Sequence, residues 1–228
     1  MGTKKQLLFL HGYLSSSDSF YCQIPYFSRY FEVYAIDFQG FGKNKGMDTP
    51  YSLDDYITQL KEFMSNNNIV KPHVIAHSFG ARVAIKMASY DQDVFDKLVL
   101  TGAAGLKPKQ TLKKIVKKGV FNLLKKFTSK DKLKKFYSQD YLSLDPVMQQ
   151  SFIKIVNEHL DDRLKFIVNK TLILFGDKDG QTPLYMAKRL NKNIRNSKLK
   201  ILRGAGHFCF IDKPYTFNME VENFLFSK

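Results

Sequence analysis

Short apolar runs and longer amphipathic segments alternate along most of the 228-residue chain. The runs are almost continuously apolar, which is typical of strands in a parallel sheet that is covered on both faces. The segments between them carry apolar residues at helical spacing, as in 51–64, where Ser52 is a candidate N-cap and Asp55 lies in the first turn. This alternation predicts an α/β fold, a mostly parallel sheet with helices on both faces. The expected strands are 7–10, 33–36, 74–76, 98–100, 172–175 and 199–202, and the expected helices are 51–64, 81–88, 185–190 and 215–226.

Residues 106–160 depart from this pattern. They contain no convincing strand, and their apolar residues recur at helical spacing between lysines. The pattern predicts a basic helical cap, 106–160, inserted between two parts of one core domain, 1–105 and 161–228. Twelve lysines and only one acid, Asp131, lie within 106–135, so this segment supplies +11 of the net formal charge of +15.

The lysines of the cap have three interpretations. They can stay in water while the apolar face of a lid covers a pocket. They can contact an anionic membrane surface, which suits a lipid or long acyl-chain substrate. They can also attract an anionic substrate or partner. No nucleic acid is expected, because no nucleic-acid-binding module is recognisable and arginines are few.

The segment "VIAHSFG" places a serine where an apolar run gives way to a helical pattern. A strand that reverses sharply into a helix holds such a serine in a strained conformation, with its hydroxyl projecting outward. The positions two before and two after must be small, because strand and helix almost collide there. Ala76 and Gly80 satisfy this requirement, although the usual motif has glycine at the first position. Ser78 is therefore the candidate nucleophile.

A serine nucleophile needs a base and a carboxylate that orients the base. His207 lies in "RGAGHFCFIDKP", directly after the last expected strand, and is the candidate base. The segment "LILFGDKDGQTP" offers two carboxylates after the preceding strand. Asp179 is the first candidate, because it lies further into the loop, and Asp177 is the second. The backbone N–H groups of Phe79 and Tyr13 are the expected oxyanion donors.

With these residues the chain resembles the α/β-hydrolase superfamily, in the esterase/lipase-like branch that carries a helical cap. The similarity extends over "LFLHGYLSSSDSF", "YAIDFQGFGKNKG", "VIAHSFGARVAI", "LVLTGAAGLKPK", "LILFGDKDGQTP" and "GAGHFCFIDKP". The order Ser78, Asp179, His207 is the order that this superfamily uses. Two features differ from its usual pattern: we expect a sheet with trimmed N-terminal strands, and the cap is unusually rich in lysine.

The resemblance implies a serine hydrolase that cleaves a small-molecule or lipid carboxylic ester through an acyl-enzyme, with no cofactor or metal. Serine at the nucleophile position argues against relatives that use aspartate, such as haloalkane dehalogenases and epoxide hydrolases. Thioester hydrolysis, acyl transfer and hydrolytic C–C cleavage use the same constellation and stay open. A non-catalytic, ligand-binding member of the superfamily is a further alternative.

Two other features bear on where the protein acts. No apolar run approaches the roughly 18 residues of a membrane span. The two cysteines, Cys22 and Cys209, provide neither a disulfide framework nor metal-ligand spacing. We therefore expect a cytoplasmic protein with reduced thiols.

Overall fold

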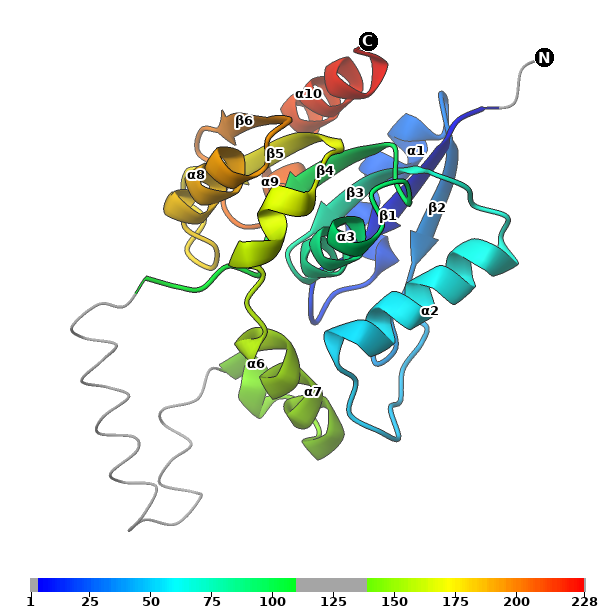
Figure 1. The fold of residues 1–228 in the computed structure, drawn as a ribbon, viewed down its shortest axis with the longest axis vertical. Coiled ribbons are helices and arrows are strands. Elements are labelled where there is room, and N and C mark those ends of the chain that lie inside the picture. Colours follow the sequence, from blue (N-terminus) through cyan, green and yellow to red (C-terminus); the bar gives the residue numbers. More distant parts are fainter. Residues whose placement is uncertain (1–3, 110–138, 228) are drawn as a thin grey trace.

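The computed structural model describes residues 4–109 and 139–227. Within these ranges the chain forms one six-stranded sheet in which every neighbouring pair is parallel, in the order β2-β1-β3-β4-β5-β6 (Figure 1). Each of the six expected strands is present, so the predicted α/β fold is confirmed. The strands are β1 (Gln6–Leu10), β2 (Glu32–Ile36), β3 (His73–His77), β4 (Lys97–Thr101), β5 (Lys170–Gly176) and β6 (Ser197–Leu202).

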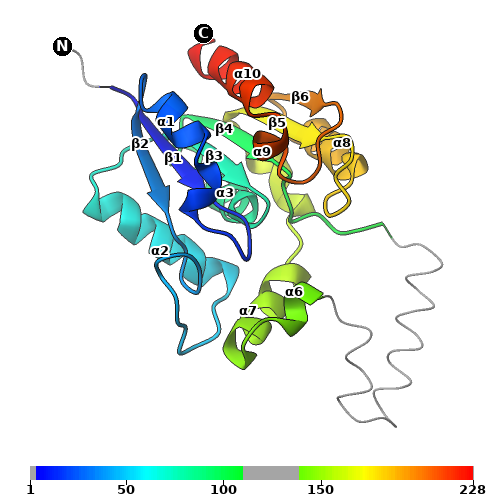
Figure 2. The ribbon, with the colours of Figure 1, turned by 180° about the vertical axis from the view of Figure 1, so that it is seen from behind.

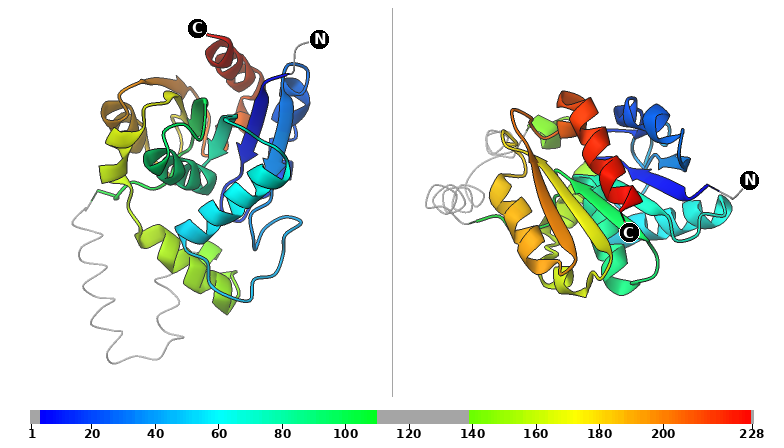
Figure 3. Two further views of the ribbon diagram at one scale, coloured as in Figure 1. Left: turned by 45° about the vertical axis from the view of Figure 1, so that its right-hand side comes forward. Right: turned by 90° about the horizontal axis from the view of Figure 1, so that it is seen from above.

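Helices cover both faces of the sheet, and successive residues of each central strand enter different cores. In β1, Leu8 and Leu10 join one apolar cluster, whereas Leu7 and Phe9 join the other. The views in Figures 2 and 3 show the two helical layers on either side of the sheet. The first cluster includes α2 (Leu53–Asn66), α3 (Phe79–Tyr90) and α8 (Leu184–Asn193). The second includes the 3-10 helix η1 (Ser17–Phe20), α1 (Gln23–Phe27), α9 (Cys209–Asp212) and α10 (Pro214–Phe226).

The expected capping of α2 is present. The Ser52 hydroxyl accepts from the Asp55 N–H, and the Asp55 carboxylate accepts from the Ser52 N–H at 2.6 Å. This reciprocal arrangement satisfies two N–H groups at the helix start and is typically worth ~1 kcal/mol. The short helices α1 and α9, η1 and the 3-10 helix η3 (Asp161–Phe166) have no counterpart among the sequence predictions.

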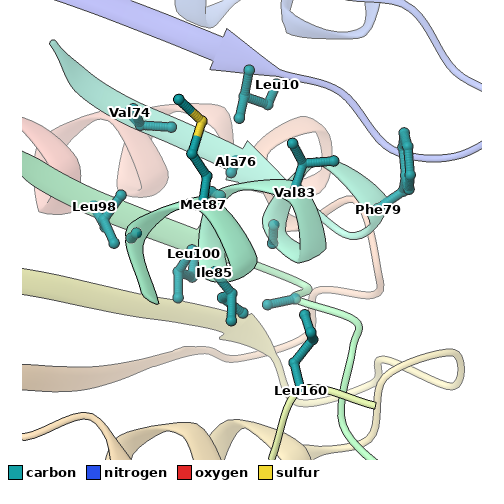
Figure 4. Packing of buried hydrophobic residues seen from close by; sticks show 14 of the residues in the cluster. Leu10, Val74, Ala76, Phe79, Val83, Ile85, Met87, Leu98, Leu100 and Leu160 are labelled. Atoms are coloured by element: carbon teal, nitrogen blue, oxygen red, sulfur yellow. The ribbon is translucent and has the colours of Figure 1, made fainter. Parts of the chain in front are cut away.

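Helix α3 is the most deeply buried helix of the described chain. Every one of its residues except Tyr90 is buried. Its side chains Val83 and Met87 lie over the strand residues Leu10, Val74 and Leu98 (Figure 4). Because α3 is enclosed by the sheet on one side and by other elements on the other, it gives the residue at its N-terminus a rigid support.

Two further helices, α6 (Gln139–Leu142) and α7 (Pro146–Asn157), lie beyond the carboxyl ends of the strands (Figure 1). The Asp145 carboxylate caps α7 by accepting from the N–H groups of Val147 and Met148, both at 2.9 Å. Core contacts include the Tyr51 N–H, which donates to the Ser151 hydroxyl at 2.9 Å. These helices occupy the part of the predicted cap that the structure describes.

Most of the lysine-rich segment, residues 110–138, lies outside the described residues, so the expectations about its charge stay predictions. The boundaries 1–105, 106–160 and 161–228 likewise stay predictions. In the part of the chain that the structure describes, no helix is both long and apolar enough to cross a membrane.

Candidate active site

Ser78 sits at the turn between β3 and α3 in a left-handed conformation, with φ +48° and ψ −104°. Such a conformation is costly for a residue with a Cβ and persists only where the surroundings enforce it. Here the Ser78 N–H donates to the Thr101 carbonyl at 3.1 Å, and the Ser78 carbonyl accepts from Ala104 at 3.2 Å. A Cβ at Gly80 would collide with the Leu10 carbonyl oxygen. The turn is therefore tight enough to require glycine there, as the sequence predicts.

The structure brings His207 and Asp179 together. His207 Nδ1 and Asp179 Oδ2 are 2.9 Å apart, and both side chains are buried. Burial alone would raise the pKa of Asp179, but hydrogen bonds from His207 and Thr182 outweigh it and hold that pKa below its usual value. An ionised Asp179 only accepts, so His207 carries its proton on Nδ1 and leaves a lone pair on Nε2. This is the tautomer that a general base requires.

Asp179 is fixed by its own loop. Its Oδ1 accepts from the N–H groups of Gln181 at 2.9 Å and Thr182 at 2.8 Å, and its Oδ2 accepts from the Thr182 hydroxyl at 2.7 Å. Asp177, the second candidate, instead accepts from the Gly204 N–H at 2.7 Å and stabilises the loop after β6. The structure thus places Asp179, and not Asp177, beside His207.

The two expected oxyanion donors line the same cavity as Ser78 and His207. Neither the Phe79 N–H nor the Tyr13 N–H has a hydrogen-bond acceptor among the described residues. His11 orders the loop that carries Tyr13: its Nδ1–H donates to the Gly12 carbonyl at 2.7 Å, and its Nε2 accepts from the Phe38 N–H at 3.0 Å. Burial lowers the pKa of His11, which keeps the ring neutral and able to make both bonds.

Two neighbours of His207 carry no role in the sequence prediction. The His77 Nε2–H donates to the His207 carbonyl at 3.2 Å, and the two rings lie 4.7 Å apart. Burial lowers the pKa of His77 to about 3, so this ring is neutral at physiological pH. Gly102, with φ +50°, passes so close that a Cβ there would lie 3.0 Å from the His207 carbonyl oxygen and 3.1 Å from its ring. Both contacts join segments distant in sequence, so local patterns could not reveal them.

The cavity measures about 400 Å³ and has a largely aromatic and aliphatic lining. The Tyr13 hydroxyl also donates to the Met148 carbonyl at 3.2 Å, which ties the loop that carries Tyr13 to α7. Arg82 lines the cavity too, although nothing in the sequence pattern singles it out. Other lining side chains are Leu14, Phe79, Phe152, Ile155, Val156 and Phe208. In the described ranges, no cluster of His, Cys, Asp or Glu could hold a metal ion.

Comparison with known proteins identifies the family. Residues 5–130, more than half of the chain, match the family model described as the alpha/beta hydrolase fold. The chain belongs to this family. Similar α/β hydrolases span nearly its whole length: the uncharacterized hydrolase YugF of Bacillus subtilis is 22% identical, with 97% of this chain and 90% of the relative covered. A 2-hydroxy-6-oxo-2,4-heptadienoate hydrolase of Pseudomonas putida is 23% identical, with 89% and 81% covered.

Solved structures give the same fold. The meta-cleavage product hydrolase CumD of Pseudomonas fluorescens superposes with a TM-score of 0.74 at 23% identity, over 99% of this chain and 92% of the other. The esterase EaEST of Exiguobacterium antarcticum gives a TM-score of 0.77 at 23% identity, over 100% and 94%. At these identities the likeness extends to the fold of this α/β hydrolase and not to its substrate.

Proposed function

We propose that this α/β hydrolase cleaves carboxylic esters through an acyl-enzyme, with Ser78 as nucleophile, His207 as base and Asp179 as the residue that orients the base. The observation that carries the proposal is the 2.9 Å bond between His207 and an ionised Asp179, at a cavity that the strained Ser78 also lines. The proposal is supported by a serine, a histidine and an aspartate that come from three separate loops, as in other serine hydrolases.

The reaction follows from these positions. Ser78 Oγ attacks the ester carbonyl carbon as its proton passes to His207 Nε2, and Asp179 stabilises the resulting imidazolium. The N–H groups of Phe79 and Tyr13 donate to the developing oxyanion, each worth ~3–4 kcal/mol in comparable sites. The intermediate then expels the alcohol, which takes the proton from His207. Water repeats the sequence on the acyl-enzyme and releases the acid.

A second candidate is hydrolysis of a C–C bond next to a ketone, in which the same residues act on a ketone carbonyl. Its support is that a relative covered over most of its length is named as a hydrolase of a hydroxy-oxo-heptadienoate. Thioester hydrolysis and acyl transfer need the same nucleophile and base. Ester hydrolysis ranks first because its leaving group is an alcohol oxygen that His207 can protonate directly, whereas C–C cleavage must expel a stabilised carbanion.

The test is hydrolysis of p-nitrophenyl esters from acetate to palmitate, combined with labelling by a fluorophosphonate. Ser78→Ala should abolish both turnover and labelling. Ser89→Ala is the matched control, because Ser89 lies on the same helix and donates only to the Lys86 carbonyl. Stoichiometric labelling without ester turnover would favour the C–C or thioester alternatives. Folded protein that neither labels nor turns over would support the non-catalytic, ligand-binding alternative.

A further inference from the structure

Arg82 brings a positive charge to the cavity wall. It lies one helical turn after Ser78 on α3 and is only 8% exposed. Among the described residues that line the cavity, Arg82 alone carries a permanent charge, and no aspartate or glutamate is among them. Burial lowers the pKa of Arg82 to about 10, so the guanidinium is still charged at neutral pH.

The hydrogen bonds of Arg82 use one of its three nitrogens. Nη1 donates to the carbonyls of Ile155 at 2.7 Å and Glu158 at 2.8 Å, at the end of α7. These two bonds account for both hydrogens of Nη1. Nε and Nη2 have no partner among the described residues, and neither is sealed from solvent. Together, Nε and Nη2 form one edge of the guanidinium, with two parallel N–H groups that match the two oxygens of a carboxylate.

Arg82 forms no ion pair with a carboxylate of the described residues, and the charge of the Glu158 carboxylate raises the pKa of Arg82 by less than burial lowers it. No carboxylate of the described chain lies within 4 Å of the guanidinium. The nearby Glu158 side chain is engaged by Lys86 at 2.6 Å, and Lys86 also binds Asp54 at 2.7 Å. A buried cation is costly unless it is paired, because burial removes its hydration. The two carbonyls offset part of this cost, and the free edge remains available to an anion.

We propose that Arg82 binds a carboxylate of the substrate, so that the preferred esters carry a second, ionised carboxyl group. This inference rests on the proposed function and adds a substrate class to it. A single guanidinium edge supplies two donors and one unit of charge, which matches a carboxylate. A phosphate dianion would leave oxygens and charge unmatched in the same cavity. Arg82 and Ser78 lie about one helical turn apart in the chain and line one cavity of about 400 Å³, so short dicarboxylic half-esters are the substrates to test.

The experiment compares mono-p-nitrophenyl esters of succinic, glutaric and adipic acid with their neutral methyl-capped counterparts. The readout is the ratio of kcat/KM for the charged ester to that for its neutral partner, after subtraction of the Ser78→Ala background. We expect the wild type to favour at least one charged ester by about tenfold or more, the scale of a charge-assisted hydrogen bond. Arg82→Gln should lower that ratio by about 10- to 100-fold, and Arg82→Lys by less.

Lys86→Met is the matched control for cap anchoring. Lys86 lies one turn further along α3 and holds Glu158, but it does not line the cavity. Its loss should therefore lower both rates together and leave the ratio unchanged. A shift in the ratio as large as that of Arg82→Gln would overturn the proposal, because a loosened cap would then explain the preference. A wild-type ratio of one or less for all three acids would also overturn it, whether or not Arg82→Gln folds.

A second readout does not depend on turnover. Glutarate should raise the Tm of the wild-type protein and leave that of Arg82→Gln unchanged, because only the wild type has the carboxylate subsite. Absence of a shift in the wild type refutes the subsite even if no ester is hydrolysed. Loss of all Ser78-dependent turnover, with the glutarate shift intact, would instead refute the proposed function alone.

Discussion

Gly102 offers a direct test of how closely the neighbouring backbone positions His207. At φ +50°, alanine would bear the cost of a left-handed L-residue, ~1–2 kcal/mol in the free energy of unfolding. Its Cβ would also lie 3.0 Å from the His207 carbonyl oxygen and 3.1 Å from the ring atoms Cε1 and Nδ1. Ordinary contacts begin at about 3.4 Å, so the loop or the ring must move by a few tenths of an ångström. Small displacements of a catalytic group are costly, so we expect kcat to fall by about tenfold.

Gly46→Ala is the matched control. Gly46 also has a positive φ, +92°, but nothing lies within 4 Å of a Cβ placed there. Both variants should lose stability in urea unfolding through backbone strain, and only Gly102→Ala should lose kcat on a p-nitrophenyl ester. Equal kcat values for the two variants would refute the inference that Gly102 is needed for the position of His207.

Two further predictions concern the groups around His207. Asp179→Asn would present an amide to His207 Nδ1 and favour the wrong tautomer of the ring, so kcat should fall by a factor on the order of 10³–10⁴. Asp177→Asn is the control, because it keeps an oxygen for the Gly204 N–H and should retain activity in the same assay. The pKa of His77 is about 3 in the folded protein, below its value of 6.5 in the unfolded chain. Below pH 6.5 the ring therefore takes up a proton only in the unfolded chain, and the free energy of unfolding falls as the pH is lowered. His77→Gln, which keeps a donor for the His207 carbonyl, should remove about 2 kcal/mol of the loss between neutral pH and pH 5 in urea titrations, while the exposed His159→Gln should change it little. An unchanged pH slope in His77→Gln would contradict the buried, neutral state of this ring.

The sheet could be predicted because each strand is a short apolar run that tertiary context reinforces. Even so, the continuous runs conceal an alternation: Leu8 and Leu10 face one core, whereas Leu7 and Phe9 face the other. Both sets of residues are apolar because helices cover both faces of the sheet. Short helices such as α1 escaped prediction, since five residues carry too little periodicity.

Ser78 could be predicted because the steric requirement around it involves residues that are close in sequence. The close approach of β1 to the start of α3 explains the small residue at Gly80, and this demand identifies Ser78 from a few neighbouring letters. The choice between Asp177 and Asp179 depends on hydrogen bonds within two loops. Their positions in the sequence could rank Asp179 before Asp177 but could not show which of them contacts His207. The sequence does not distinguish Arg82 from other residues of a helix, because the carbonyls that it binds lie more than 70 positions away.

The attachment of the cap to α3 affects how this enzyme can be engineered. Arg82 and Lys86 join the end of α7 to α3, the helix that follows Ser78, so a substitution at either position acts on the pocket shape and on the position of Ser78 at once. Phe152 and Val156 line the cavity from α7 without taking part in that attachment. Phe152 also packs edge-on against the Tyr13 ring, with the ring centroids 5.3 Å apart, so Val156 is the position at which randomisation would vary the pocket wall while it leaves both the Ser78 turn and the Tyr13 loop intact.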